Sequence, residues 1–212
     1  MKFSRIPEAT ITRLSNYSRN LEELWGDGVN VISSEKLAAR CGVNSAQIRK
    51  DLAYFGEFGV RGVGYYVQDL LFEIKRILGL NKDWNLGLIG IGNLGSALIA
   101  HENFLRQGYH FVAAFDNDPI KIGKKLPNGI KVESIDNLAE VKARENIEIG
   151  VISTSAGTAQ NIANRLIEVN VRAILNFAPV QIKVPPGFRV ENVDFTVKLD
   201  NLAYYLTTEK AE

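Results

Sequence analysis

Apolar residues recur at helical spacing through the first 80 residues of the chain. One stripe, with intervals of three or four residues, predicts an amphipathic helix that begins near Pro7 and ends near Gly26. Its members are Ile11, Leu14, Tyr17, Leu21 and Leu24. Further helices are predicted over 35–40, from Asn44 onward and over 68–78. The first 80 residues are therefore predicted to be mainly helical.

The two short helices stand on either side of a tight turn at 41–43, in which Gly42 supplies a positive φ. Asn44 and Gln47 have the spacing of a capping box that opens the second of these helices. The residues predicted to face inward there are Ile48, Leu52 and Phe55. Helix, glycine turn and helix form the pattern of a helix-turn-helix. Four glycines interleaved with aromatic residues over 55–66 predict a hairpin, which would make this domain a winged helix.

From residue 84 onward, short apolar runs alternate with helical stretches. Such alternation predicts an α/β domain, with a parallel sheet covered on both faces. The predicted strands lie at 86–89, 111–115, 147–152 and 173–176, and the predicted helices at 94–107, 138–144 and 158–169. A last segment, 196–206, has an apolar face without a predicted partner. We therefore expect three parts: a winged helix-turn-helix domain at 1–80, a Rossmann domain at 84–195 and a C-terminal helix at 196–212.

A glycine motif joins the first predicted strand to the first predicted helix of the second part. Gly90 permits the tight turn, Gly92 lets a pyrophosphate approach the backbone, and Gly95 lets the helix pack closely on the strand. Asp116 follows 21 residues after Gly95, at the end of the second strand, where it can bind the adenosine ribose. A carboxylate at that place repels a 2′-phosphate, so the motif predicts NAD(H) rather than NADP(H). The alternative, a glycine turn that binds nothing, fits this order of elements less well.

Composition excludes several other classes of protein. One cysteine and two histidines in 212 residues are too few for an intramolecular disulfide or a Cys/His zinc cluster. No apolar run approaches the roughly 20 residues that cross a bilayer, and the N-terminus lacks a secretory apolar region. We therefore expect a cytoplasmic protein that binds neither metal nor membrane. The net charge of +1 argues against a chain that is basic throughout, but it is compatible with a local basic patch.

The remaining length disfavours an enzyme. A nicotinamide dehydrogenase usually adds a substrate domain and an acid/base residue to its cofactor domain, and little of this chain is left for either. His101 and His110 are interpreted as surface or packing residues, and no nucleophile–base pair is visible. We therefore expect a sensor without catalytic residues. Two other functions stay open: a compact NAD-dependent oxidoreductase, and a module that binds CoA or another nucleotide beside a protein-docking winged helix.

A local excess of basic residues favours DNA as a partner of the first part. Within 36–61 there are five basic and two acidic residues. The helix that opens at Asn44 can place polar side chains in a major groove, and Arg61, flanked by glycines, suits a narrow minor groove. The candidate DNA-binding residues are Ser45, Gln47, Arg49, Lys50, Tyr54 and Arg61. A solvated face on a protein-binding winged helix is the alternative.

Several segments occur here in a combination that is specific to one family. They are PEA at 7–9 with Arg13 and YSR at 17–19, QIRKDLAYFG at 47–56, GVRGVGY at 59–65, GIGNLG at 90–95, FDNDPIKIG at 115–123, ILNFAP at 174–179 and ENVDF at 191–195. Together they resemble the Rex family of bacterial redox-sensing transcriptional repressors, over essentially the whole chain.

The resemblance implies a homodimer in which the C-terminal helix of each chain is swapped onto its partner. It also implies that the free or NAD+-bound form binds palindromic, double-stranded operator DNA, and that NADH favours a closed form that does not. The residues expected at the cofactor are Gly90, Ile91, Gly92, Asn93, Leu94, Gly95, Asp116, Thr154, Phe177 and Phe195.

Three residues match family positions at the redox switch. Arg19 and Asp194 match a pair proposed to form across the domain junction when NAD+ is bound, and His101 stands where one branch has a tyrosine. Oxidised nicotinamide carries a positive charge that NADH lacks, so a nearby carboxylate can distinguish the two forms. We hypothesise that Asp194 is this sensor. Cys41 is interpreted as a core residue rather than as a thiol switch.

Overall fold

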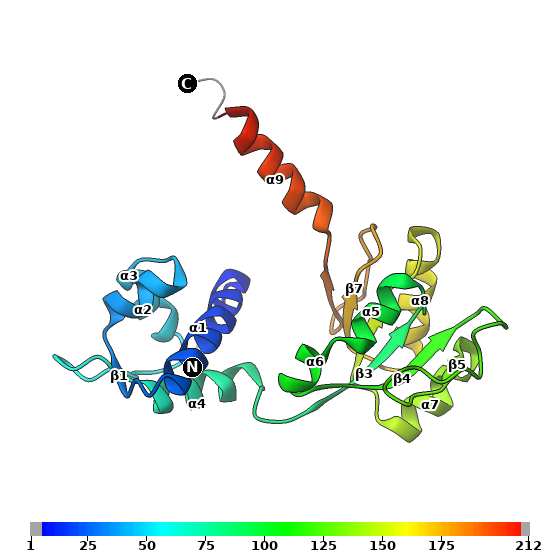
Figure 1. The fold of residues 1–212 in the computed structure, drawn as a ribbon, viewed down its shortest axis with the longest axis horizontal. Helices are drawn as coiled ribbons and strands as arrows, with labels where there is room; N and C mark the ends of the chain where they lie inside the picture. The colour runs from blue at the N-terminus through cyan, green and yellow to red at the C-terminus, as the bar shows by residue number, and fades with distance from the viewer. Residues whose placement is uncertain (1–5, 209–212) are drawn as a thin grey trace. The chain divides into compact units, whose positions relative to one another are not determined.

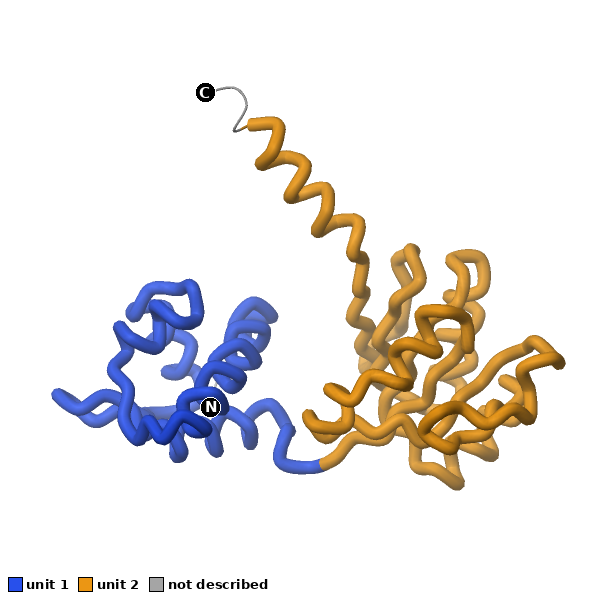
Figure 2. The backbone as a smooth tube through the Cα atoms, viewed as in Figure 1, with its two compact units in different colours: residues 1–82 blue, residues 83–212 orange. Residues whose placement is uncertain are grey.

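The computed structural model describes residues 6–208 and divides into two compact units (Figures 1 and 2). Unit 1 is Met1–Lys82 and unit 2 is Asp83–Glu212. The division falls between the parts expected from the sequence, the first of which ends at residue 80 and the second of which begins at residue 84. No helix within the described residues is both long and apolar enough to cross a membrane.

Unit 1 contains four helices and a two-stranded sheet within the described residues. Its elements are α1 (Glu8–Gly26), β1 (Val31–Ile32), α2 (Ser34–Cys41), α3 (Ser45–Leu52), β2 (Tyr65–Tyr66) and α4 (Val67–Leu78). The turn between α2 and α3 has Gly42 in the left-handed conformation, at φ 67°. This arrangement confirms the predicted helix-turn-helix, and we call the loop over 53–64 the wing.

The wing differs from the hairpin predicted over 55–66. A short bridge between Val60 and Gly64 closes its tip, whereas β2 pairs in antiparallel fashion with β1. Gly64 has φ 109°, and a Cβ at this position would overlap the carbonyl oxygen of Ile32. Gly64 therefore allows the chain to lie close against β1. As a result β2 pairs with β1 and not with the other side of the predicted hairpin.

The core of unit 1 forms around α1. Four residues of the predicted stripe are buried, namely Leu14, Tyr17, Leu21 and Leu24. The fifth, Ile11, is 39% exposed, and Thr10 takes the buried position in the first turn of the helix. Thr10 is buried in place of Ile11 because the core contains a carboxylate, that of Asp51, which needs hydrogen-bond donors. The hydroxyl of Thr10 donates a hydrogen bond of 3.0 Å to the carboxylate of Asp51.

Asp51 of α3 is completely buried and binds α1 through charged and neutral donors. Arg13 donates to it from Nε at 2.6 Å and from Nη2 at 2.7 Å, and the hydroxyl of Tyr17 donates at 2.9 Å. The amide of Gln47, one turn earlier on α3, donates at 2.9 Å. Burial by itself raises the pKa of this carboxyl, but the hydrogen bonds outweigh burial and lower the pKa to about 2. The network therefore fixes α3 against α1.

The start of α3 confirms half of the predicted capping box. The side chain of Asn44 accepts a hydrogen bond of 2.8 Å from the N–H of Gln47. The side chain of Gln47 does not return to Asn44, as the second half of a capping box requires, and binds Asp51 instead. That half of the prediction is wrong, because the amide of Gln47 turns toward Asp51 and donates a charge-assisted hydrogen bond to its carboxylate, so its oxygen does not accept from the backbone N–H of Asn44.

Unit 2 contains a six-stranded parallel sheet in the order β5-β4-β3-β6-β7-β8. Its strands are β3 (Trp84–Ile89), β4 (Tyr109–Asp116), β5 (Val132–Ser134), β6 (Ile149–Ile152), β7 (Ala173–Asn176) and β8 (Arg189–Asn192). The four predicted strands are β3, β4, β6 and β7. The other two strands, β5 and β8, form the edges of the sheet. Each is short and has a neighbour on one side only, and neither contains the apolar run that would predict a buried strand. This order confirms the predicted Rossmann architecture.

Helices cover both faces of the sheet. They are α5 (Asn93–Ala100), α6 (Glu102–Arg106), α7 (Leu138–Glu145) and α8 (Ala156–Glu168), with the short 3-10 helix η1 (Ile135–Asn137) before α7. One apolar cluster includes Leu88 of the sheet and Ile99 of α5. A second includes Phe115 of the sheet and Leu166 of α8. Two separate clusters confirm the prediction that both faces are buried.

The helix predicted over 94–107 is in fact two helices, α5 and α6. His101 between them has an extended backbone, with φ −85° and ψ 106°, so the helix ends there. The imidazole Nδ1 accepts a hydrogen bond of 3.3 Å from the N–H of Asn103 and thereby caps α6. The prediction of one helix is wrong because this cap satisfies a donor that a continuous helix would bind internally.

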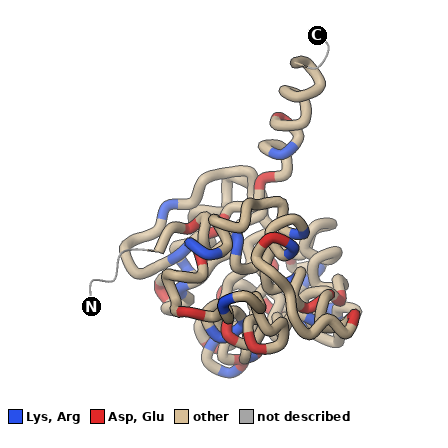
Figure 3. Tube along the Cα trace, turned by 90° about the vertical axis from the view of Figure 1, so that its left-hand side faces the viewer, with Lys and Arg blue, Asp and Glu red and all other residues tan. Residues whose placement is uncertain are grey.

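The described chain ends in α9 (Phe195–Thr208), which buries none of its side chains. Its large apolar residues are between 51% and 65% exposed: Phe195, Val197, Leu199, Leu202, Tyr204, Tyr205 and Leu206. Figure 3 shows that charged residues are sparse along this helix. The apolar face predicted over 196–206 is therefore present, and its size indicates that another surface covers it.

The network at Asp51 leads to a prediction about stability. We expect Asp51→Asn to lower the unfolding free energy of unit 1 by about 3 kcal/mol, because Arg13 loses its charge partner in the core. The carboxylate stabilises the fold above about pH 4, and this contribution is lost as the pH falls from the ordinary value of 3.8 toward about 2. The variant should therefore lose less stability than the wild type over that range of pH.

Urea unfolding followed by the fluorescence of Trp25, in a chain with Trp84→Phe, reports on unit 1. The control is Asp27→Asn, at an exposed aspartate just after α1, which should change the unfolding free energy by less than about 0.5 kcal/mol. Equal effects of the two substitutions would contradict the role of Asp51.

Candidate functional site

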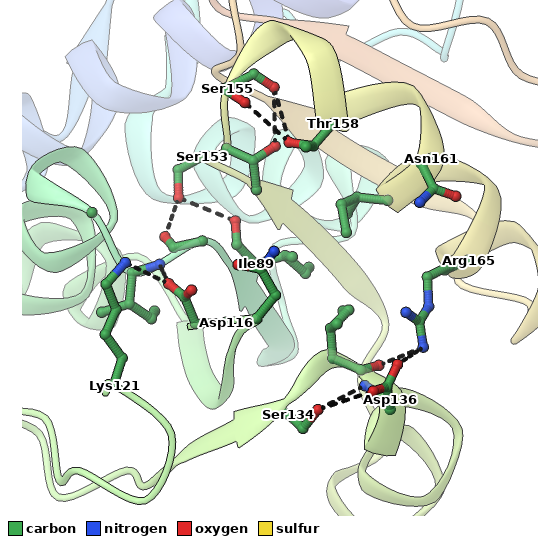
Figure 4. A pocket seen from close by; sticks show the side chains of 17 residues that line it. Ile89, Asp116, Lys121, Ser134, Asp136, Ser153, Ser155, Thr158, Asn161 and Arg165 are labelled. Carbon is green, nitrogen blue, oxygen red and sulfur yellow. Dashed lines mark hydrogen bonds and ion pairs between the residues drawn. The ribbon is translucent and has the colours of Figure 1, made fainter. Parts of the chain in front are cut away.

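A cleft of about 560 Å³ opens at the carboxyl ends of β3, β4, β5 and β6 (Figure 4). Segments that follow these strands line it at 89–92, 116–117, 134–136 and 153–155, together with part of α8. From β3 the chain crosses to β4 on one side and later to β6 on the other, so the strand order reverses between β3 and β6. Doubly wound sheets bind their ligands at such a switch point.

The turn after β3 contains the three predicted glycines in different roles. Gly90 has φ 98°, and a Cβ there would overlap Ser153 and Thr154. A Cβ at Gly95 would overlap the carbonyl oxygen of Gly90. Nothing lies within 4 Å of the position that a Cβ of Gly92 would take. Two glycines therefore serve close packing of the turn, while the third leaves open space in front of the backbone.

This open space lies at the start of α5. Within the described residues no side chain caps α5, and none caps α8, which begins across the cleft. The backbone N–H groups of both first turns and the positive ends of both helix dipoles are therefore available to an anion. A pyrophosphate fits this arrangement, because it needs N–H donors and close approach to a backbone without a side chain. The cleft thus fits a dinucleotide.

Asp116 ends β4 beside the glycine turn and is 6% exposed. Its Oδ2 accepts hydrogen bonds from the N–H of Ile91 at 2.7 Å and from Nζ of Lys121 at 3.0 Å. Its Oδ1 accepts one from the N–H of Asp118 at 3.0 Å. Burial raises the pKa of this carboxyl, but the hydrogen bonds outweigh burial and hold the pKa below its ordinary value. The carboxylate is therefore ionised at neutral pH, and it ties the glycine turn to β4.

The cleft also contains residues that sequence reasoning missed. The hydroxyl of Ser153, after β6, donates to the carbonyl of Gly90 at 2.8 Å. Arg165 of α8 donates to Asp136 at 2.9 Å and to the carbonyl of Ile135 at 3.0 Å, so it joins α8 to η1 (Figure 4). These residues come together only through the order of the strands, and no local motif in the sequence marks them.

The ten residues predicted at the cofactor fall into three groups. Five of them line the cleft, namely Gly90, Ile91, Gly92, Asp116 and Thr154. Asn93 and Leu94 are exposed in the first turn of α5, and Gly95 is buried. Phe177 and Phe195 do not line the cleft. Their ring centroids are 6.3 Å apart, where β7 ends and α9 begins.

The candidate DNA-binding residues lie on α3 and the wing, and their side chains differ in how free they are. Lys50 and Arg61 are exposed, and neither pairs with an acidic residue of the described chain. Arg49 is also exposed, but it donates to Oγ of Ser34 at 2.8 Å and lies 3.6 Å from the carboxylate of Glu35. The two unpaired cations are therefore the best placed to meet phosphates or base edges.

The other candidates are less free. Ser45 is half-buried in the first turn of α3, and Tyr54, just after this helix, is 37% exposed. Gln47 is a candidate DNA-binding residue from the sequence, but its amide turns inward to Asp51. The reason is that a buried carboxylate needs donors, and Gln47 supplies one of them.

The residues expected at the redox switch lie in different parts of the chain. Arg19 is exposed on α1, whereas Asp194 belongs to unit 2, so their pairing stays a prediction. The N–H and the hydroxyl of Thr196 donate to Asp194 at 2.9 Å and 2.6 Å; these bonds lower its pKa and cap α9. Cys41 is buried in the core of unit 1, and burial raises the pKa of its thiol to about 11. This confirms its interpretation as a core residue.

Two family models match the chain. One, described as "Putative DNA-binding protein N-terminus", matches residues 5–53, and the other, described as "CoA binding domain", matches residues 81–180. A curated protein of Syntrophobacter fumaroxidans, named "Redox-sensing transcriptional repressor Rex", is 60% identical over 207 residues. The match covers 98% of this chain and 99% of that protein.

Solved structures are similar along nearly the whole length as well. The structure of RSP in complex with beta-NAD+ and operator DNA has a TM-score of 0.92 at 37% identity, and covers 98% of this chain and 95% of its own. The structure of RSP in complex with beta-NADH has a TM-score of 0.88 at 36% identity, and covers 98% and 97%.

The different roles of the glycines give a prediction for the cleft. We expect Gly92→Ala to change the unfolding free energy of unit 2 by less than about 0.5 kcal/mol, because its methyl group meets only open space. The same methyl group should weaken the binding of NADH by about tenfold or more, because it occupies the approach of the pyrophosphate. Isothermal titration calorimetry and thermal unfolding measure the two effects.

The matched variant is Gly95→Ala, which we expect to lower both stability and NADH binding, because its methyl group overlaps the carbonyl oxygen of Gly90. Normal NADH binding by Gly92→Ala would contradict a pyrophosphate at this turn.

Proposed function

The chain belongs to the Rex family of redox-sensing transcriptional repressors, and on this basis we propose that it represses transcription in response to the NADH/NAD+ ratio. It binds palindromic operator DNA through unit 1 when it is free or holds NAD+. It leaves the operator when NADH occupies the cleft of unit 2. The observation that carries this proposal is the presence, in one chain, of a winged helix with unpaired cations and a dinucleotide cleft at a sheet switch point.

The cleft residues divide the work of binding the dinucleotide. The backbone N–H groups at the starts of α5 and α8 bind the pyrophosphate, and the carboxylate of Asp116 accepts a hydrogen bond from the adenosine ribose. Phe177 and Phe195 offer apolar surface to the nicotinamide end. When bound, the nicotinamide supplies the chemical difference that is sensed, a positive charge in the oxidised form and none in the reduced form.

Asp194 senses this charge in the proposed mechanism. Its carboxylate is exposed at the start of α9, next to Phe195. The carboxylate of Asp194 would be attracted by a positive charge on a bound nicotinamide, and this attraction would favour one conformation of the dimer, in which Asp194 pairs with Arg19. Without that charge the balance shifts to the conformation that does not bind DNA. A ligand moves such an equilibrium only by its difference in affinity for the two states, and a nearly complete switch needs a ratio of about 10⁴.

The proposal includes a homodimer. An operator with two-fold symmetry requires two copies of α3 at a fixed spacing, and a single chain supplies one. The exposed apolar face of α9 is the surface that we assign to the second copy, with the helix swapped onto the partner. A repressor of this kind acts where the chromosome is, so we place it in the cytoplasm.

Two observations distinguish the proposal from its alternatives. The ionised cleft residues Asp116, Lys121, Asp136 and Arg165 are all engaged in ion pairs, which leaves them poorly suited to move a proton in catalysis. The family model for CoA-binding domains matches the same part of the chain, so CoA is the competing ligand that an experiment has to include. Asp116 beside the glycine turn favours a dinucleotide with a free ribose.

We expect NADH to release the chain from its operator at concentrations at which NAD+ and CoA do not. The operator is first selected from a library of random inverted repeats, and release is followed by fluorescence anisotropy of the labelled DNA. Absence of DNA binding, or equal release by NADH and CoA, would contradict the proposed function.

Variants on the DNA-binding surface test the other half of the proposal. Lys50→Ala and Arg61→Ala should each weaken operator binding by about tenfold, because each removes an unpaired cation, and both should keep normal NADH affinity. Lys124→Ala, at an exposed lysine of unit 2, serves as the control with unchanged operator affinity.

The cap at α9 allows a test that separates the charge of Asp194 from its structural role. We expect Asp194→Asn to keep α9 capped, because asparagine caps helices as well as aspartate does. The variant should nevertheless lose the difference between NADH and NAD+ in operator release, since the charged sensor is gone. Anisotropy titrations with both nucleotides measure this difference. If Asp194→Asn responds to NADH like the wild type, its charge is not the sensor.

A further inference from the structure

Lys121 places a cation beside the acidic residue that binds the adenosine ribose. Its Nζ lies 3.0 Å from Oδ2 of Asp116 and 4.0 Å from Oδ2 of Asp118. The side chain lines the same cleft and reaches toward Asp116 in Figure 4. It is 36% exposed, so solvent and a ligand have access to it. Lys121 therefore lies where the hydroxyl groups of the adenosine ribose are expected to bind.

The hydrogen bonds of Asp116 limit what the carboxylate can do by itself. A carboxylate oxygen accepts about two hydrogen bonds. Oδ2 already accepts one from Ile91 and one from Lys121, and Oδ1 accepts one from Asp118, which leaves a single acceptor position. A ribose presents two hydroxyl groups at this end of a dinucleotide. One of them can donate a hydrogen bond to Asp116. The oxygen of the other can accept a hydrogen bond from the ammonium group of Lys121.

The charge around Asp116 also differs from that of a carboxylate without a nearby cation. Asp116 and Asp118 bring two negative charges, and Lys121 brings one positive charge between them. A 2′-phosphate that met two bare carboxylates would be strongly repelled. In this loop it meets an ammonium as well, and a lysine is a compact point charge that binds phosphate. The repulsion by Asp116 is therefore offset in part.

We propose that Lys121 sets how strictly the cleft discriminates against a 2′-phosphate, and that it gives 2′-phosphorylated dinucleotides a residual affinity for this site. The inference rests on the proposed function, because it requires a dinucleotide whose adenosine ribose lies at Asp116. It differs from the simple expectation that the carboxylate alone determines selectivity. Selectivity instead depends on the balance between Asp116 and its own ion-pair partner.

A purely structural role of Lys121 would have a different consequence. The lysine ties the loop over 117–123 to the end of β4, and loosening this loop would weaken all adenosine ligands alike. A direct role changes the ratio of affinities between ligands that differ only at the 2′ position. The ratio is therefore the quantity to measure.

The probes are ADP-ribose and ADP-ribose 2′-phosphate, which lack the nicotinamide and so do not depend on redox sensing. In the full-length chain, we expect Lys121→Met to weaken the binding of ADP-ribose by about threefold, because one ribose hydroxyl loses its donor, and to weaken the binding of ADP-ribose 2′-phosphate about tenfold more than that. Lys121→Arg should restore the wild-type ratio within about threefold, because it keeps the charge. Lys124→Met, three residues further along and outside the cleft, should leave both affinities unchanged.

Calorimetry gives the two affinities, and thermal unfolding shows that each variant is folded. An equal loss for both probes, or a ratio that does not change, would overturn the role of Lys121 while the proposed function stands. Failure of ADP-ribose to bind the folded wild-type chain would overturn the proposed function, and this inference with it. The two failures are therefore distinguishable.

Discussion

A carboxylate that leaves water has to recover its hydrogen bonds inside the fold, and two carboxylates of the described chain, Asp51 and Asp116, are buried in this way. Some of their donors come from distant segments. Asp51 binds residues of α1 that lie 34 to 41 positions away, and Asp116 binds the N–H of Ile91 across 25 positions. An unpaired buried charge costs several kcal/mol, so each unit loses stability when these segments are not in place. The two acids therefore tie the local geometry of each functional surface to the stability of its unit.

The same constraint decides which side chains are free to bind. In unit 1 the carboxylate of Asp51 engages Arg13 of α1 and Gln47 of α3, so these two polar side chains are used inside the domain. Lys50, next to Asp51 in the sequence, points away from this network and is exposed. In unit 2 the carboxylate of Asp116 holds Ile91, and the glycine turn is thereby set beside the acid. A pyrophosphate site and a ribose site thus form as one unit rather than as two independent features.

The sequence predicted those parts of the fold that depend on local patterns. The buried strands, the turn at Gly42 and the motif from Gly90 to Gly95 were predicted because periodicity and glycine spacing report on neighbouring residues. The network at Asp51 was not predicted, because nothing near Asp51 indicates that Thr10, Arg13 and Tyr17 will surround it. The inward turn of Gln47 and the exposure of Ile11 follow from that network, so they were missed for the same reason. Ser153 and Arg165 reach the cleft through the order of the strands, which local patterns do not give.

The residues assigned to the two ends of the dinucleotide have different roles. Those at the adenosine and pyrophosphate supply affinity, and those at the nicotinamide distinguish the oxidised from the reduced form. NAD+ and NADH have the same adenosine and the same pyrophosphate, so in the proposed mechanism the glycine turn, Asp116 and the starts of α5 and α8 bind the two forms alike. Contacts that are equal in both forms add affinity and shift no equilibrium. The discrimination has to arise at the nicotinamide, and the residues assigned to that end are Phe177, Asp194 and Phe195. Two of these stand at the start of α9, the helix whose apolar face needs a partner. In the proposed mechanism a change of charge at the nicotinamide therefore acts at the start of the helix that is assigned to the dimer, and the rest of the site can bind tightly without weakening the switch.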